Sequence, residues 1–229
     1  MSTIILVAKT PAPGRVKTRL TPFMTPREAS GLAQAFLRDM VASLASFVNY
    51  DLQVAIPDED DPGPLTDLLA GRGRIVTQGR GSLGDRLIHV MAEAFREPGP
   101  VLVIGSDHPS VPVAMVGACL EAARSGAVGW IPTEDGGFAA LASPRPVPEL
   151  FRDVPWSTPR VASTLRERAS DAGCRLHDVG TWYDVDTAAD LRRLAGDLAR
   201  GDACPNTREF LHTLSPPLTL RSLPSGVEE

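Results

Sequence analysis

Hydrophobic and polar positions alternate along the chain in a way that predicts strands and helices in turn. Short apolar runs of strand length begin near residues 3, 52, 101 and 127, and most end in loops rich in glycine, proline or aspartate. Between them, apolar residues recur at helical spacing, as at Leu32, Phe36, Met40 and Leu44. Because strands that alternate with helices build parallel sheets, the pattern predicts a mostly parallel sheet with helices on both faces.

The expected elements follow one another along most of the chain. The expected strands cover residues 3–8, 52–56, 74–77, 101–104, 127–131, 138–142 and 175–179. The expected helices cover residues 26–47, 65–69, 83–95, 113–123, 159–168 and 188–200. Capping-box spacing marks two helix starts, at Thr25 with Glu28 and at Thr187 with Asp190. Residues 157–159 are expected to cap the helix that ends near residue 168.

The domain is expected to end near residue 200. A chain of 229 residues is long enough for one α/β domain with a substantial core and short for two. Prolines at 205, 216, 217 and 224 stand among scattered polar residues after Gly201. We therefore expect a proline-rich C-terminal tail over residues 201–229, which lies on the surface or is disordered.

Composition excludes several classes of protein. No apolar stretch approaches the length of about 18 residues that a membrane span needs, and Lys9 interrupts the first apolar run too early for a secretory signal. The three cysteines have no paired spacing, which argues against disulfides and favours the cytoplasm. The net charge of -5 makes nucleic acid a poor partner, so local clusters of positive charge carry more information.

The densest cluster of positive charge follows the first expected strand. Lys9, Gly14, Arg15, Lys17 and Arg19 lie in a loop that also contains two prolines. Exposed backbone N–H groups together with lysine and arginine are suited to an anionic phosphate. A solvated basic loop is the alternative, but its place at the end of a strand in an acidic chain favours phosphate binding. We expect these side chains to point away from the core.

A glycine-rich segment, residues 78–86, offers a second candidate. It contains the pattern G-x-G-x-x-G between an expected strand and helix, and Asp107 follows at the end of the next strand. This is the sequence pattern of a nicotinamide-dinucleotide site. However, the apolar pattern of the strand before it is weak, and this strand is the third of the chain rather than the first. The dinucleotide hypothesis also leaves the basic loop without a role.

Four acidic residues also lie at the ends of expected strands or in turns. Asp107 ends the strand at residues 101–104 and is placed to hold a divalent metal over phosphates, although a capping turn explains it equally well. Glu134 and Asp135 precede paired glycines and are candidate proton acceptors, or parts of a plain turn. Asp186 lies beside a helix N-terminus, where the helix dipole favours a carboxylate, and with Asp107 it is a candidate metal ligand.

Five motifs together resemble one family. They are the basic loop at residues 7–20, Gly-Ser-Asp-x-Pro at 105–109, P-x-x-D-G-G at 132–137, Trp-Ser-Thr-Pro-Arg-Val at 156–161, and Asp-Val-Asp-Thr-x-x-Asp-Leu at 184–191. In this order they resemble the radical-SAM/selenodomain-associated transferases. That family belongs to the GT-A (nucleotide-diphospho-sugar transferase) superfamily and is similar to 2-phospho-L-lactate guanylyltransferase.

The resemblance implies a GT-A-like, Rossmann-type three-layer α/β sandwich and assigns roles to particular residues. It implies nucleotide-phosphate contacts at Gly14, Arg15, Lys17 and Arg19, base or ribose contacts near Gln78, Gly79 and Gly84, and Mg²⁺ (or Mn²⁺) at Asp107 and Asp186. The chain departs from the family after the paired glycines, where residues 138–141 replace the usual tyrosines and a further glycine. This departure leaves the acceptor open.

The expected function is that of a metal-dependent transferase acting on a nucleotide or nucleotide sugar and a small acceptor, with neither nucleic acid nor membrane as partner. In nucleotidyl transfer, Lys17 and the ion at Asp107 stabilise charge on an α-phosphate. In glycosyl transfer, Asp135 or Glu134 serves as base. A non-catalytic nucleotide-binding protein and an NAD-dependent oxidoreductase that uses the Gly79–Gly84 loop are the alternatives.

Overall fold

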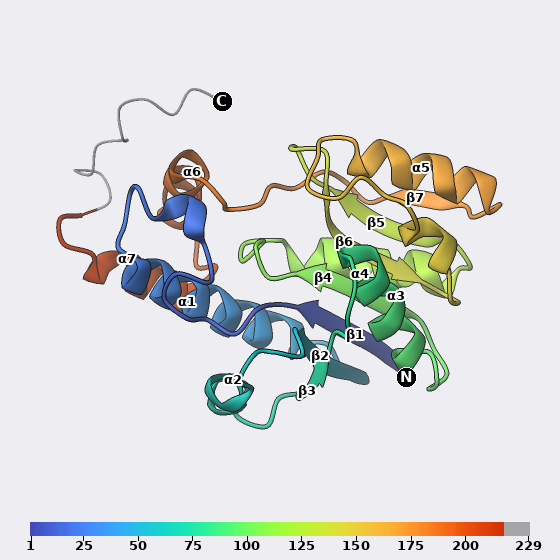
Figure 1. Ribbon diagram of the computed structural model, residues 1–229, viewed down its shortest axis with the longest axis horizontal. Coiled ribbons are helices and arrows are strands. Elements are labelled where there is room, and N and C mark those ends of the chain that lie inside the picture. The colour runs from blue at the N-terminus through green and yellow to red at the C-terminus, as the bar shows by residue number, and fades with distance from the viewer. Residues whose placement is uncertain (218–229) are drawn as a thin grey trace.

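The structure, a computed structural model that describes residues 1–217, contains one twisted sheet of seven strands (Figure 1). The strands are β1 (Ser2–Val7), β2 (Tyr50–Ile56), β3 (Arg74–Thr77), β4 (Val101–Gly105), β5 (Val128–Pro132), β6 (Phe138–Ser143) and β7 (Leu176–Asp178). Their order across the sheet is β3-β2-β1-β4-β6-β5-β7. β6 runs antiparallel to β4 and β5, and the remaining neighbours pair in parallel, so the predicted mostly parallel sheet is confirmed.

Helices cover both faces of this sheet. They are α1 (Pro26–Leu44), α2 (Gly63–Leu69), α3 (Leu83–Ala94), α4 (Val113–Arg124), α5 (Val161–Asp171), α6 (Ala188–Leu198) and α7 (Pro205–Thr213), with 3₁₀ turns η1 (Thr18–Leu20) and η2 (Pro148–Phe151). None of these helices is long and apolar enough to cross a membrane, as far as the described residues extend.

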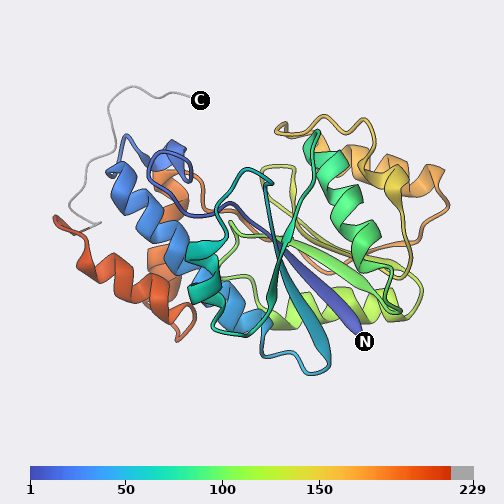
Figure 2. The same ribbon diagram turned by 60° about the horizontal axis from the view of Figure 1, so that its bottom comes forward.

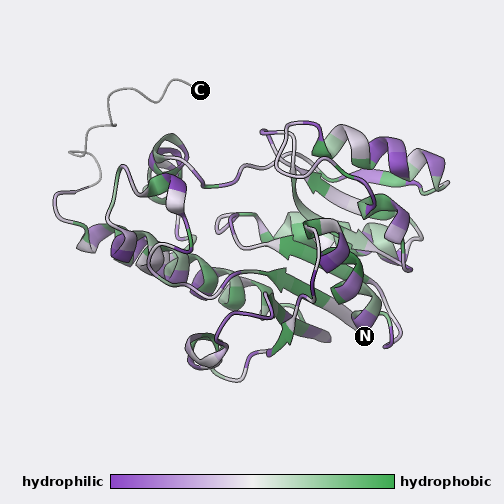
Figure 3. Cartoon of the chain, in the orientation of Figure 1, coloured by the Kyte–Doolittle hydropathy of each residue, from purple (hydrophilic) through white to green (hydrophobic). Residues whose placement is uncertain are grey.

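The alternation of side chains along the buried strands explains the two layers of helices. In β1, Ile4 and Leu6 are fully buried against α1, α2 and α4, whereas Ile5 is fully buried on the opposite face against α3. Successive side chains of a strand point to opposite faces, so a continuous apolar run needs cover on both sides. The strongest hydrophobic character accordingly lies in the central strands (Figure 3). The predicted three-layer α/β sandwich is confirmed.

Helix starts follow local side-chain chemistry. The capping boxes at Thr25 and Thr187 are present as predicted, and Ser82 with Asp85 forms a third at the start of α3. The predicted cap of α5 is wrong, because that helix begins at Val161 without a side-chain cap. Ser157 instead has a left-handed backbone with φ 61, which breaks the chain direction before the helix.

Helix α7 was not predicted from the sequence, which indicated a surface or disordered tail after residue 200. It packs alongside α1 (Figure 2), and its first turn is bound by Asp39, which is only 4% exposed. The carboxylate of Asp39 accepts hydrogen bonds from the backbone and side chains of both Asn206 and Thr207, at 2.6–3.0 Å. A charged capping group of this kind stabilises a helix N-terminus. The rest of the predicted tail, residues 218–229, lies outside the described residues.

Candidate active site

A cleft of about 560 Å³ opens at the carboxyl ends of β1 and β4. The chain runs from β1 outward to β2 and β3 on one side, and then crosses to β4 on the other side. The connections that leave β1 and β4 therefore lead to opposite sides of the sheet. The gap between two such strands is the usual ligand site of an open α/β sheet. The sequence-predicted residues that line the cleft are Lys9, Arg15, Lys17, Gln78, Asp107 and Asp186.

Lys17 lies at the floor of the cleft between two carboxylates. Its Nζ atom contacts Oδ1 of Asp107, lies 3.0 Å from Oδ1 of Asp186, and donates to the carbonyl oxygen of Val185 at 2.7 Å. An ammonium group has three donors, so these contacts use all of them. The side chain is only 5% exposed and its nitrogen lies 5.5 Å from the ring centre of Phe36. The expectation that this side chain points away from the core is therefore wrong.

The electrostatics of the contact between Lys17 and Asp107 favour the charged forms of these two groups. Desolvation acts to raise the pKa of Asp107, but the adjacent Lys17 ammonium outweighs it and holds that pKa below its ordinary value. Desolvation likewise acts to lower the pKa of Lys17, and Asp107 and Asp186 together raise it. Since both carboxylates touch one nitrogen atom, they are also close enough to share one ion.

The other residues of the basic loop are placed less deeply. Arg15 forms an ion pair of 2.7 Å with Asp60 and keeps half of its side chain exposed. Arg19 is 73% exposed and lies 3.6 Å from Oδ2 of Asp186, so it reaches the same carboxylate from the rim. Gly14 has φ 77, a left-handed conformation that suits glycine in the turn before Arg15. Neither Gly14 nor Arg19 is part of the lining of the cleft.

Local structure accounts for much of the glycine-rich segment. The buried Gln78 donates through Nε2 to the carbonyl oxygens of Ala8 and Ala55, which fastens three strand ends together. The backbone N–H of Gly79 donates to Asp58 at 2.9 Å. At Gly84, a Cβ atom would lie 2.3 Å from the carbonyl oxygen of Phe151, so glycine is required for close packing of α3. Their contacts with a base or ribose stay predictions.

The turn after β5 holds Asp135 outside the lining of the cleft. Its Oδ1 accepts hydrogen bonds from the Thr133 hydroxyl at 2.5 Å and from the Gly137 N–H at 2.9 Å, so this carboxylate organises the turn. Glu134 forms a bidentate ion pair with Arg193 at 2.6 and 2.8 Å, and these hydrogen bonds lower its pKa. The structure thus brings Lys17, Asp107 and Asp186 together and leaves Asp135 and Glu134 to one side.

Sequence reasoning gave no primary role to Asp184, which lies among other carboxylates. Desolvation and the charges of Asp135, Asp186 and Asp190 raise its pKa to about 6. The spacing Asp-Val-Asp could have indicated this, because alternate residues of an extended segment point to the same side and Asp184 therefore lies on the side of Asp186. Behind Asp107, the buried His108 lies with Nδ1 3.1 Å from the carbonyl oxygen of Tyr183, and desolvation lowers its pKa.

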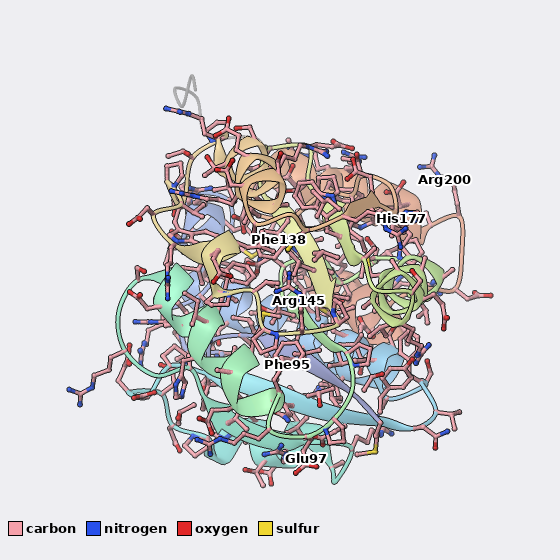
Figure 4. All side chains as sticks on the ribbon, turned by 90° about the vertical axis from the view of Figure 1, so that its right-hand side faces the viewer. Phe95, Glu97, Phe138, Arg145, His177 and Arg200 are labelled. Atoms are coloured by element: carbon pink, nitrogen blue, oxygen red, sulfur yellow. The ribbon has the colours of Figure 1, made fainter. Side chains whose placement is uncertain are left out.

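An aromatic wall borders the cleft near β6. Phe138 lines the cleft and packs against Phe151 and Trp156, each with ring centres 6.5 Å from its own. Figure 4 shows Phe138 beside the segment that carries η2. Phe138 is the first of the four residues at which the chain departs from the resembled family.

The fold and the cleft define a transferase of the nucleotide-diphospho-sugar transferase superfamily, and comparisons with known proteins agree. The chain belongs to the family described as "Uncharacterized protein conserved in bacteria (DUF2064)", which it matches over residues 40–158. It is 31% identical over 192 residues to a protein of Streptomyces coelicolor named phosphoenolpyruvate guanylyltransferase, an alignment that covers 82% of this chain and 87% of that protein.

Solved structures share the fold. A crystal structure described as a "putative nucleotide-diphospho-sugar transferase" from Desulfovibrio desulfuricans G20 superposes with a TM-score of 0.85 at 28% identity, covering 92% of this chain and 94% of that one. The 4-diphosphocytidyl-2C-methyl-D-erythritol synthase of Anaerococcus prevotii superposes with a TM-score of 0.60 at 11% identity, covering 87% and 96%. The resemblance to the GT-A superfamily is confirmed.

Proposed function

We propose that the protein is a divalent-metal-dependent nucleotidyltransferase that transfers a nucleoside monophosphate from a nucleoside triphosphate to the phosphate of a small phosphorylated acid. One observation carries this proposal: Lys17, Asp107 and Asp186 converge at the floor of a cleft at the carboxyl ends of β1 and β4. The 31% identity to a phosphoenolpyruvate guanylyltransferase makes GTP and phosphoenolpyruvate the first pair of substrates to test.

The donor atoms in the cleft fit Mg²⁺ or Mn²⁺. Two carboxylates and a backbone carbonyl surround the Lys17 ammonium, and hard oxygen ligands are those that Mg²⁺ prefers. Within residues 1–217, no group of three or more His, Cys, Asp or Glu side chains is arranged to hold an ion. This agrees with Mg²⁺, which takes one or two carboxylates and completes its shell with water and phosphate oxygens. Asp107 and Asp186 would hold the ion, which neutralises developing charge on the phosphates.

The residues of the chain would act mainly by positioning and charge stabilisation. Arg15 presents a half-exposed guanidinium to the cleft and is suited to bidentate phosphate binding. Lys17 uses its three donors on protein oxygens, so its contact with an α-phosphate requires it to exchange at least one of them. An acceptor phosphate oxygen then bonds to the α-phosphorus, and the bond to the pyrophosphate leaving group breaks.

Glycosyl transfer from a nucleotide sugar is the second candidate. It is favoured by the 28% identity and TM-score of 0.85 to a structure described as a putative nucleotide-diphospho-sugar transferase. Against it, β4 is followed by a single aspartate, Asp107. The candidate bases are also engaged already, Glu134 by Arg193 and Asp135 by its own turn. We therefore rank nucleotidyl transfer first.

The test is a pyrophosphate-release assay. GTP, ATP, CTP and UTP are each incubated with phosphoenolpyruvate and Mg²⁺, and the product is identified by mass spectrometry. Our proposal predicts acceptor-dependent release of pyrophosphate and a nucleotidylated acid, both abolished by EDTA. Release of a nucleoside diphosphate from a nucleotide sugar, with no reaction of any triphosphate, would overturn it in favour of glycosyl transfer.

A further inference from the structure

We propose that Asp60 is a positioning residue that fixes Arg15 and the start of the basic loop in the form that binds the nucleotide phosphates. This inference rests on the proposed function. Asp60 lies in the loop between β2 and α2, and its side chain is only 1% exposed. It is not part of the lining of the cleft, so it would act through the residues it holds.

Both carboxylate oxygens of Asp60 are used on the basic loop. Oδ1 accepts from Nη2 of Arg15 at 2.7 Å, and Oδ2 accepts from the backbone N–H of Thr10 at 2.7 Å. The hydroxyl of Thr10 donates in turn to the carbonyl oxygen of Asp61 at 2.9 Å. The basic loop is thus fastened near its start and again at its first arginine, while Pro11 and Pro13 restrict the backbone between them.

The loop between β2 and α2, which contains Asp60, also contacts the glycine-rich segment. Asp58 accepts the backbone N–H of Gly79 at 2.9 Å. Residues 58–61 therefore contact both candidate nucleotide-binding segments. Burying a carboxylate is costly unless its oxygens are satisfied, and the contacts of Asp60 satisfy both of them with residues of the basic loop.

If Asp60 is neutralised, its loss as a charge and its loss as a positioning group change the affinity for phosphate in opposite directions. A carboxylate beside Arg15 partly cancels its charge, so neutralisation alone would strengthen phosphate binding. If Asp60 instead orients the guanidinium, its removal lets Arg15 leave the cleft and weakens binding, because preorganised groups lose less entropy on binding. The direction of the change in affinity therefore decides between the two.

The experiment measures Mg²⁺–GTP affinity by calorimetry for the wild type, Asp60→Asn, Arg15→Ala and the double variant. Asn keeps the volume of Asp and one acceptor for the Thr10 N–H. We expect Asp60→Asn to weaken binding about tenfold, the range for losing a charge-assisted contact. We expect the double variant to bind no worse than Arg15→Ala, since Asp60 acts through Arg15. A merely structural role would instead give additive losses.

The matched control is Asp61→Asn, which removes a carboxylate charge from the residue next to Asp60 in the sequence. The Asp61 side chain accepts only from Gly63 among the interactions described, and it lies at an exposed site. Its variant should bind within about twofold of the wild type, as for an exposed charge. If Asp60→Asn fails to fold, Asp60→Glu, which keeps the charge but displaces the carboxylate by one methylene, should weaken binding several-fold.

Unchanged or tighter binding in Asp60→Asn, or wild-type affinity in Asp60→Glu where that variant replaces it, would overturn the inference and leave the proposed function intact. A wild-type protein that binds neither GTP nor another nucleoside triphosphate or nucleotide sugar with Mg²⁺ would overturn the proposed function, and the inference with it.

Discussion

The basic loop and the glycine-rich segment both border the cleft, and both have sequence patterns typical of phosphate binding. They differ in the contacts that their residues make. In the basic loop, the ammonium of Lys17 reaches Asp186, 169 residues away in the chain. In the glycine-rich segment, Ser82 and Asp85 bind each other to start α3, and Gly84 allows close packing against Phe151. A glycine pattern can thus be satisfied by local turns and packing, whereas convergence of opposite charges requires the whole fold.

The largest effect is expected at Asp107, which contacts Lys17 of the basic loop. Asp107→Asn should lower turnover by about 10³-fold, the scale for losing a preorganised electrostatic contact to the reacting group. The free energy of unfolding should change little, because Lys17 keeps its contacts with Asp186 and Val185. Steady-state kinetics and urea unfolding measure the two quantities. Turnover within tenfold of the wild type would remove Asp107 from the catalytic site.

Lys17→Met should separate nucleotide binding from metal binding. Losing a charged donor should weaken nucleotide affinity by about 1.5–3 kcal/mol. The same change leaves two carboxylates without their cation, so Mn²⁺ should bind more tightly in the absence of nucleotide. Electron paramagnetic resonance of free Mn²⁺ and calorimetry with GTP report these effects. Wild-type affinity for GTP in a folded Lys17→Met protein would contradict the role of Lys17.

Gly84→Ala tests the packing role of the glycine-rich segment. The new Cβ would lie 2.3 Å from the carbonyl oxygen of Phe151 and 2.9 Å from Nε1 of Trp156. Overpacking of this kind should lower the free energy of unfolding by about 1–3 kcal/mol. The control is Gly196→Ala in α6, where the added Cβ would meet no atom of the described residues within 4 Å beyond the adjacent backbone of its own helix. That variant should raise stability by about 0.5–1 kcal/mol.

The smallest effect is expected at Asp184 and depends on pH. Its pKa rises to about 6 from the ordinary 3.8 on folding, so the folded protein holds the proton more tightly between these values. The free energy of unfolding should therefore fall as pH rises through this window and then level off. Asp184→Asn should remove this dependence and stabilise the protein at pH 7 by about 1 kcal/mol, after allowance for screening. Identical pH profiles of unfolding in both proteins would contradict this account.

The fold was largely predictable because its strands are buried on both faces. β1 and β4 each contain a continuous apolar run of at least four residues that ends in a loop, and that pattern depends on the sequence alone. Helix α7 was not predictable, because its start depends on Asp39 of α1, 167 residues from Asn206. Its own sequence contains Pro205 and polar residues that also suit a tail.

The candidate site was predictable in part. Asp107 and Asp186 were identified because each follows an extended segment, and parallel strand ends meet at one edge of a sheet. The burial of Lys17 was missed, because its left-handed backbone (φ 48) is not marked by a glycine. Asp60 was missed because an aspartate in an acidic loop looks solvated until the fold brings Arg15 and Thr10 against it.

A calorimetric titration of GTP into the wild-type protein, once with Mg²⁺ and once with EDTA, determines whether nucleotide binding in this cleft requires a metal ion. The acidic pair holds its own cation in Lys17, and Mg²⁺ relies on phosphate oxygens to complete its shell. We therefore predict weak binding of Mg²⁺ alone, at least tenfold tighter binding of GTP with Mg²⁺ than with EDTA, and loss of this difference in Asp107→Asn. Equal GTP affinity with Mg²⁺ and with EDTA in the wild type would contradict a metal-dependent nucleotidyltransferase site between Asp107 and Asp186.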